Sequence, residues 1–195
     1  MKDYFPVLKY FNLPNVITTM GFIFGITACY FLVQGSLRSA IVCLFFCSVM
    51  DLVDGWFAKK LNQQSDFGRH VDTLVDFFVC VIMPIWIVYA FLAHNMFIIF
   101  ALIFYCVCGL WRLAGYNIRG AEEYFAGLPV PGAMLAVTVA LWSVVYVGLP
   151  AWVGAVAFFI TGPLMISNIK LKKYGLWQGI LAGAGVVFLA VVLIF

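Results

Sequence analysis

The chain has 195 residues, of which 66% are hydrophobic and only 10% are charged, and its mean hydropathy is +1.10. Soluble domains are about 45–50% apolar and about 25% charged, so this composition excludes a soluble globular domain and predicts an all-α polytopic membrane protein. The net charge of +3 is too small to favour a nucleic acid as partner.

The apolar runs leave room for about six to eight transmembrane helices, because each span needs about 20 residues. Residues 1–12 mix charges with aromatic rings and are expected to lie on the membrane surface. Residues 1–195 are otherwise expected to form a single membrane domain. Whether 131–168 is one kinked span or two stays open, since Pro150 is compatible with both. The preferred count is seven helices, at 14–34, 37–61, 67–93, 95–117, 131–148, 151–168 and 176–195.

The basic residues are distributed unevenly between the two sides that seven spans create. If the N-terminus is cytoplasmic, ten of the eleven Lys and Arg residues fall on that side, and only Arg38 lies opposite. Cytoplasmic loops of membrane proteins are enriched in Lys and Arg. We therefore expect a protein of the cytoplasmic (inner) membrane with its N-terminus on the cytoplasmic side. The lysines within 170–173 are also expected to attract anionic membrane lipid.

The first span combines polar residues at its start with glycines further along. Asn15, Thr18 and Thr19 are placed either to contact a nucleotide or to cap the helix. Gly21 and Gly25 form a small-xxx-small pattern, as do the glycines at 179 and 183 in the last span. Such patterns let helices approach closely. We favour packing within the chain over a dimer seam, although the pattern permits a dimer.

Four of the eight acidic residues fall in the second and third spans. Asp51 and Asp54 are three residues apart, and Asp72 and Asp76 are four apart, so each pair shares one helical face. The connector between these spans is short, which makes them antiparallel neighbours. We therefore expect the four carboxylates to converge a few turns below the cytoplasmic surface.

Glycines share these faces, and a polar pair precedes the third span. Gly55 and Gly68 are expected to leave gaps where a nucleoside approaches the backbone. Asp66 is expected to cap the third helix, or Ser65 if that helix begins one residue earlier.

The six cysteines all lie in apolar segments without partnering histidines, and we interpret them as small hydrophobic residues rather than disulfides or metal ligands.

A carboxylate near the bilayer centre costs about 2.5–3.5 kcal/mol, so four of them need compensation. The basic residues nearest in sequence, Lys59, Lys60 and Arg69, lie toward the connector. Oxygen ligands without His or Cys favour Mg²⁺ or Mn²⁺. Two such ions held by four carboxylates would attract phosphate groups, as in two-metal phosphoryl transfer.

Two other interpretations of the acids stay open. Paired acids inside a membrane also occur in proton relays and cation transporters, and a purely structural cluster is the third possibility. The neighbouring glycines and Lys59 favour phosphate chemistry, because a cation transporter needs neither.

The stretch DLVDGWFAK at 51–59, followed after eight residues by GRHVDTLVD at 68–76, resembles the CDP-alcohol phosphatidyltransferase family. The family pattern is Asp-x-x-Asp-Gly-x-x-Ala-Arg, about eight residues, then Gly-x-x-x-Asp-x-x-x-Asp. One position departs from it, because Lys59 stands where the family has arginine. Lysine still offers a cation to a diphosphate, but without the two-pronged geometry of a guanidinium.

The resemblance implies an enzyme of this family, in which an alcohol displaces CMP from a CDP-linked lipid, and it suggests a homodimer. It also implies roles for matching residues. The implied metal ligands are Asp51, Asp54, Asp72 and Asp76, and Asp76 is also the implied catalytic base. The implied nucleotide or diphosphate contacts are Gly55, Ala58, Lys59 and Gly68. Asn15 and Thr18 are added to these contacts as candidates.

Two later stretches, LWRLAGYNI at 110–118 and FAGLPVPGA at 125–133, resemble the phosphatidylserine synthase branch of the family. That branch has Arg-Leu-Ala-Arg-Phe-Asn and then Gly-Leu-Pro-x-Pro, and here Gly115 replaces the second arginine. A serine acceptor carries a carboxylate, which Arg112 is placed to bind. Arg112 also fits a snorkelling anchor at the end of a span. Asn117 and Arg119 are further candidates for the acceptor site.

These observations predict transfer of a phosphatidyl group from CDP-diacylglycerol to the hydroxyl of L-serine, with release of CMP and with two Mg²⁺ or Mn²⁺ ions. The lipid can be a diacyl or an archaeal ether lipid. The alternative within the family is an acceptor such as glycerol phosphate or inositol phosphate, and the alternative from another class is a divalent-cation transporter.

Overall fold

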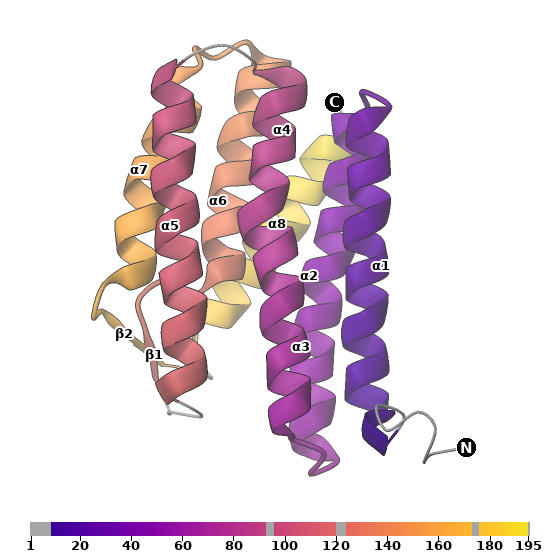
Figure 1. The fold of residues 1–195 in the computed structure, drawn as a ribbon. Helices are drawn as coiled ribbons and strands as arrows, with labels where there is room; N and C mark the ends of the chain where they lie inside the picture. Colours follow the sequence, from indigo (N-terminus) through magenta and orange to yellow (C-terminus); the bar gives the residue numbers. More distant parts are fainter. Residues whose placement is uncertain (1–8, 93–95, 120–123, 173–175, 195) are drawn as a thin grey trace.

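The computed structural model describes residues 9–92, 96–119, 124–172 and 176–194. Nearly all of these residues are helical, which confirms the predicted all-α class (Figure 1). The elements in chain order are α1 (Leu13–Val33), α2 (Leu37–Lys60), α3 (Asp66–Asp76), the π-helix η2 (Phe77–Ile82), α4 (Met83–Phe91), α5 (Met96–Arg119), β1 (Tyr124–Ala126), α6 (Val130–Trp142), the π-helix η3 (Ser143–Val147), α7 (Trp152–Ile166), β2 (Lys170–Lys172) and α8 (Leu176–Ile194).

Within the described residues the helices form seven rods, because α3, η2 and α4 follow one another without a break, as do α6 and η3. Five rods are long and apolar enough to cross a membrane, and the remaining two are apolar but shorter. The region 131–168 forms two helices, which separate at Gly148, with a φ of 76°, and at Pro150. Helix α1 begins at one end of the bundle and α8 finishes at the other (Figure 1), as an odd number of rods requires.

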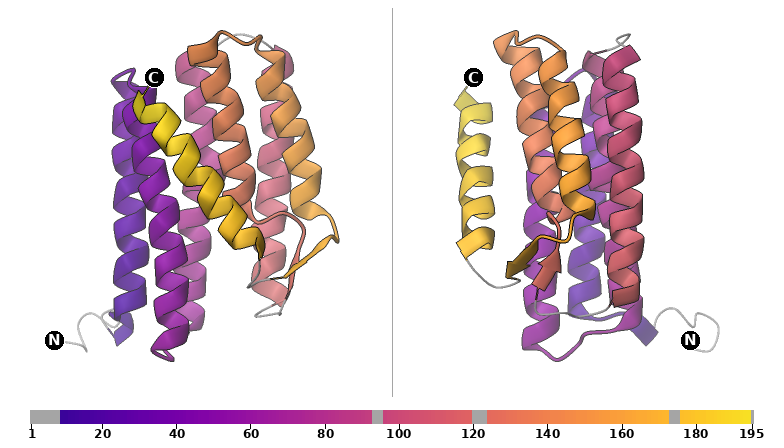
Figure 2. Two further views of the ribbon diagram at one scale, coloured as in Figure 1. Left: turned by 180° about the vertical axis from the view of Figure 1, so that it is seen from behind. Right: turned by 90° about the vertical axis from the view of Figure 1, so that its left-hand side faces the viewer.

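The rods pack in two groups, and the rod made of α3, η2 and α4 contacts both of them. Helix α1 lies along α2, and α7 packs against both α5 and α6. Helix α8 crosses the back of the bundle obliquely and contacts α2 and α6 (Figure 2). The first glycine pattern serves packing within the chain, as predicted, because a Cβ on Gly21 would lie 3.3 Å from Cβ of Met50. At glycines 179 and 183 of α8, a Cβ would meet no described atom within 4 Å.

A short β-ladder was not predicted from the sequence. Strands β1 and β2 pair antiparallel, with Ala126 opposite Lys170, at the end of the bundle that also holds the start of α1 (Figure 1). Directly after β1, the Gly127 N–H donates to the Ile169 carbonyl at 2.8 Å, and the Leu128 N–H donates to the Leu164 carbonyl at 2.8 Å. These bonds tie the chain before α6 to the end of α7.

Gly127 is required by this junction. Its φ is 83°, and a Cβ would press against the carbonyl oxygens of Leu164, Met165 and Ser167. We expect Gly127→Ala to lower the free energy of unfolding by about 3 kcal/mol, since it adds left-handed strain and a clash with backbone. Gly148→Ala is the matched control, because its φ is 76° but a Cβ there would meet nothing within 4 Å. Thermal unfolding in detergent measures both, and an equal loss in the two variants would contradict the role of the carbonyl contacts.

Candidate active site

The reversal between α2 and α3 is built from local sequence signals. Helix α2 ends at Lys60, and Asn62, two residues later, has a φ of 51°. The Asn62 N–H donates to the Lys59 carbonyl at 3.2 Å, and the Gln63 N–H donates to the Ala58 carbonyl at 2.9 Å. This pair of bonds is a Schellman motif, in which asparagine tolerates the left-handed position well. The motif satisfies the last carbonyls of α2 and turns the chain toward α3.

Helix α3 begins with a side-chain cap from Ser65, whose Oγ accepts a hydrogen bond from the Gly68 N–H at 3.0 Å. The expectation that Asp66 is the cap was therefore wrong, and Ser65, the alternative, is correct. Asp66 lies in the first helical turn instead, where its carboxylate meets Arg69 Nη2 at 2.7 Å. A negative charge there is favourable, because the first turn carries unpaired N–H groups.

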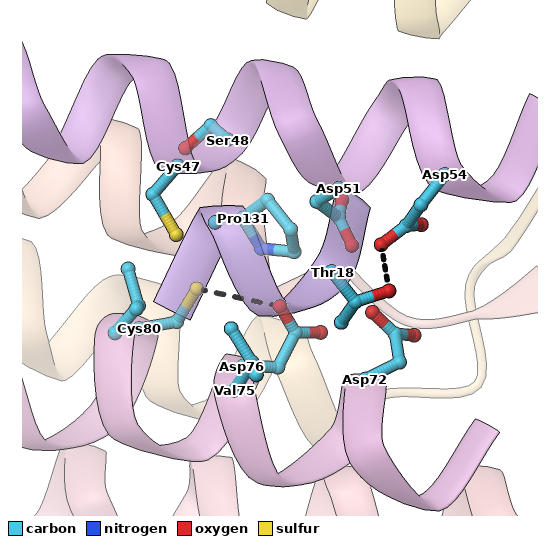
Figure 3. A pocket seen from close by; sticks show the side chains of 12 residues that line it. Thr18, Cys47, Ser48, Asp51, Asp54, Asp72, Val75, Asp76, Cys80 and Pro131 are labelled. Carbon is cyan, nitrogen blue, oxygen red and sulfur yellow. Dashed lines mark hydrogen bonds between the residues drawn. The ribbon is translucent and has the colours of Figure 1, made fainter. Parts of the chain in front are cut away.

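Three of the four predicted acids meet in one cluster. Asp51 of α2 and Asp72 and Asp76 of α3 each offer a carboxylate oxygen, and these oxygens all lie within 4.8 Å of one another. Figure 3 shows the side chains of α2 and α3 pointing toward each other across the pocket. Oxygen donors at such spacing fit a hard divalent cation. The cluster can hold such an ion, which would offset the mutual repulsion of its carboxylates.

Asp54 lines the same pocket but is held to one side by α1. It is only 6% exposed, and its Oδ2 accepts a hydrogen bond from the Thr18 hydroxyl (Figure 3). The Thr18 oxygen also lies 3.1 Å from the Pro14 carbonyl. A hydroxyl has one proton, and a carboxylate is the stronger acceptor of the two. Thr18 therefore orients the fourth acid beside the other three.

Asn15 contacts α3 and does not cap α1. The cap is Asn12, whose side chain accepts from the Asn15 N–H at 3.0 Å, so neither Asn15 nor Thr18 is the cap. Asn15 Nδ2 donates to the Tyr10 carbonyl at 2.9 Å. A Cβ on Gly68 would lie 2.7 Å from Asn15 Oδ1, so the expected gap at Gly68 is filled by this amide. At Gly55 nothing lies within 4 Å, and that gap is open as expected.

The inner wall of the pocket contains residues that were missing from the predicted site. Cys80 Sγ lies 3.9 Å from Asp76 Oδ1, and Cys47, Ser48 and Pro131 also line the pocket (Figure 3). A signal for the two cysteines is present in the sequence, because Cys47 precedes Asp51 by four residues and Cys80 follows Asp76 by four. All six cysteines are free, as predicted.

The remaining candidates lie outside the lining of this pocket. Ala58 and Lys59 belong to the last turn of α2, where Ala58 is half-buried and Lys59 is exposed. Arg112 of α5 places its guanidinium over the Tyr116 ring, 5.8 Å from the centroid. Among the described residues, α5 contributes no side chain to the pocket lining. Helix α5 includes Asn117 and Arg119, but their side chains lie outside the described part of the chain.

Comparison with known proteins gives a consistent set of similarities. The sequence profile of the CDP-alcohol phosphatidyltransferase family matches residues 11–163. The chain is 30% identical over 171 residues to a CDP-diacylglycerol–serine O-phosphatidyltransferase of Methanocaldococcus jannaschii, covering 87% of this chain and 78% of the relative. It is 30% identical to the Bacillus subtilis protein of the same name, covering 83% and 90%. An archaetidylserine synthase of Methanothermobacter thermautotrophicus is 25% identical, covering 86% and 72%.

Proposed function

The chain belongs to the CDP-alcohol phosphatidyltransferase family, and from this premise we propose that it transfers a phosphatidyl group from CDP-diacylglycerol to the hydroxyl of L-serine, releasing CMP and forming phosphatidylserine. The observation that carries the proposal is the meeting of Asp51, Asp72 and Asp76, with Asp54 beside them, in one pocket. The serine relatives, which align over most of both chains, support the choice of acceptor.

We assign the four aspartates as ligands of two divalent ions, Mg²⁺ or Mn²⁺. When bound, such ions neutralise negative charge on a diphosphate and stabilise the departing phosphate oxygen. The donor set supports this assignment, because Asp51, Asp72 and Asp76 all offer carboxylate oxygens, and Cys47 and Cys80, which also line the pocket, are not in that cluster. Thr18 contributes by fixing the carboxylate of Asp54 through its hydroxyl.

Asp76 is the proposed catalytic base. Its carboxylate takes the proton from the serine hydroxyl while the serine oxygen attacks the phosphorus that bears diacylglycerol. The bond from that phosphorus to the oxygen shared with CMP breaks, and CMP leaves with the electron pair. In this scheme the remaining nucleotide candidates line the path of the CDP group: Gly55, Ala58, Lys59, Gly68 and Asn15.

For the acceptor we propose that Arg112 binds the serine carboxylate, with Asn117 and Arg119 on the same helical segment as further candidates. A guanidinium pairs with a carboxylate through two parallel hydrogen bonds. Arg112 lies seven residues before the end of α5, and α5 ends in the same half of the bundle as the α2–α3 turn (Figure 1). Its guanidinium also lies over the Tyr116 ring, 5.8 Å from the centroid.

Replacing Arg112 with alanine is expected to raise the KM for serine about 10- to 100-fold with a smaller change in the KM for CDP-diacylglycerol, since one charge-assisted contact is lost. Arg38→Ala is the matched control, because Arg38 also covers a tyrosine ring, that of Tyr146 at 6.0 Å, but lies in the first turn of α2, which starts at the opposite end of the bundle. Initial rates at varied serine concentration measure both. An unchanged KM for serine in Arg112→Ala would remove Arg112 from the acceptor site.

We further propose the cellular setting. The apolar rods make the chain an integral membrane protein. The Lys and Arg distribution supports a cytoplasmic membrane with the active site on the cytoplasmic side. Residues 1–195 act as one catalytic unit, with 1–12 at the interface, and the family resemblance supports a homodimer.

An acceptor panel tests the proposed reaction against its alternatives. The purified protein is incubated with CDP-diacylglycerol, Mn²⁺ and, in turn, serine, glycerol phosphate or inositol phosphate, and released CMP is measured. CMP with serine alone is the expected result. Release of CMP only with a phosphorylated alcohol would identify that alcohol, and not serine, as the acceptor. No CMP with any alcohol, together with Mn²⁺ uptake into proteoliposomes, would favour the cation transporter.

A further inference from the structure

A π-helical turn directly follows Asp76. In η2 the backbone bonds run five residues back, and the Met83 N–H donates to the Phe78 carbonyl. Pro84 follows, and proline has no N–H to offer the carbonyl four residues earlier, which is that of Cys80. The proline ring would also clash with that carbonyl in a regular α-helix. The π turn inserts one extra residue into the helical register, and this accommodates the Pro84 ring next to the Cys80 carbonyl.

Helix α5 replaces the donor that Pro84 lacks. The Tyr105 hydroxyl donates to the Cys80 carbonyl at 2.8 Å, and Tyr105 is 0% exposed. The next residue of α5, Cys106, places its Sγ 3.6 Å from the Val81 carbonyl. A buried carbonyl without a donor is destabilising, and the Tyr105 hydroxyl supplies the Cys80 carbonyl with a donor.

Two glycines make room for the turn on either side. A Cβ on Gly25 of α1 would lie 2.9 Å from Val79, and a Cβ on Gly109 of α5 would lie 2.8 Å from Val81. The π turn is therefore held closely between α1 and α5. Gly109 lies one helical turn beyond Tyr105, so the same face of α5 provides both the space and the donor.

The register of this turn decides where Asp76 points. Asp76 immediately precedes η2, and Cys80 within it contacts Asp76 Oδ1 through its thiol at 3.9 Å. Removing one residue from the register would rotate the helix on one side of the turn by about 100° relative to the other. Either the acid face of α3 or the buried face of α4, with Met83 and Ile87, would then leave its partner.

We propose that Tyr105 is a positioning residue for the reaction: its hydroxyl holds the π turn at Cys80, and the turn keeps the Asp76 carboxylate opposite Asp51 and Asp72. The proposal rests on the proposed function, in which Asp76 is the base. Tyr105 itself lies behind η2 and is outside the pocket lining among the described residues.

The first test is Tyr105→Phe, which removes only the hydroxyl. We expect kcat to fall about 10- to 100-fold, as a misplaced catalytic group causes, while the KM for each substrate changes by less than about twofold. Tyr89→Phe is the matched control, because Tyr89 lies on the same rod as Asp76 and is 73% exposed. Wild-type kcat in Tyr105→Phe would overturn the proposal. If the wild-type protein itself releases no CMP, the proposed function fails instead.

A second variant separates positioning from stability. Pro84→Ala returns an N–H that can donate to the Cys80 carbonyl in an α-helical register. In Tyr105→Phe alone, the Cys80 carbonyl loses its donor and we expect a lower melting temperature. In the double variant Tyr105→Phe/Pro84→Ala we expect the melting temperature to return toward that of wild type, because the Cys80 carbonyl again has a donor. We expect kcat to stay low, because the π turn is not held. Recovery of both quantities would show that Tyr105 only satisfies a buried carbonyl, and would overturn the positioning role.

Discussion

Replacing Asp76 with asparagine is expected to lower the rate of CMP release by at least about 1,000-fold, within the range that a general base contributes. Asparagine keeps the size of the side chain and one carbonyl oxygen, but its amide neither accepts the serine proton nor carries the negative charge of a metal ligand. The loss is therefore expected in kcat, with the protein still folded. The measurement is CMP release by purified protein in detergent, with CDP-diacylglycerol, serine and Mn²⁺.

Asp66→Asn is the control for this substitution. Asp66 lies on the same helix, ten residues before Asp76, but it is exposed and pairs with Arg69 at 2.7 Å near the α2–α3 turn. Exposed ion pairs contribute little to stability, so Asp66→Asn is expected to retain wild-type turnover. Wild-type turnover in Asp76→Asn would exclude Asp76 as the base and as a required ligand.

Withdrawal of divalent cations is expected to abolish turnover, and addition of Mn²⁺ or Mg²⁺ is expected to restore it. The reason is electrostatic, because Asp51, Asp72 and Asp76 bring their oxygens within 4.8 Å of one another and a diphosphate adds further negative charge. EDTA treatment followed by titration with each metal measures the effect. Undiminished CMP release in excess EDTA would contradict metal-dependent transfer.

Thermal unfolding gives a second readout of the same metal site that needs no substrate. A cation that binds only the folded protein stabilises it by about 2.7 kcal/mol at a concentration 100 times its Kd. We therefore expect Mn²⁺ to raise the melting temperature of wild type but to have little effect on the double variant Asp51→Asn/Asp72→Asn. An equal rise in both would place the bound cation elsewhere.

The sequence was sufficient to predict the elements that depend on local periodicity. The spacing of Asp51, Asp54, Asp72 and Asp76, together with a short connector, indicated two antiparallel helices with facing acids, and three of the acids do meet. The seven-rod arrangement followed from the alternation of apolar runs and basic loops. These features are encoded within a few turns of helix, so a single sequence carries the signal.

The missed features depend on contacts between segments that are far apart in the chain. The β1–β2 ladder joins residues near 125 and 171, and neither three-residue strand has a pattern of its own. The amide of Asn15 fills the space at Gly68 because α1 packs against α3, which no local pattern predicts. The η2 turn needs both Pro84 and the Tyr105 hydroxyl, and only the proline is visible as a local signal.

The most direct test of the central claim follows both products of the proposed transfer. Purified protein is incubated with CDP-diacylglycerol, Mn²⁺ and radiolabelled serine, and the CMP in the aqueous phase is compared with the label in the lipid phase. The proposed reaction predicts one CMP for each labelled lipid formed, and neither product in Asp76→Asn. CMP release without label in the lipid phase would contradict serine as the acceptor, and label in the lipid without CMP would contradict transfer from the CDP-linked lipid.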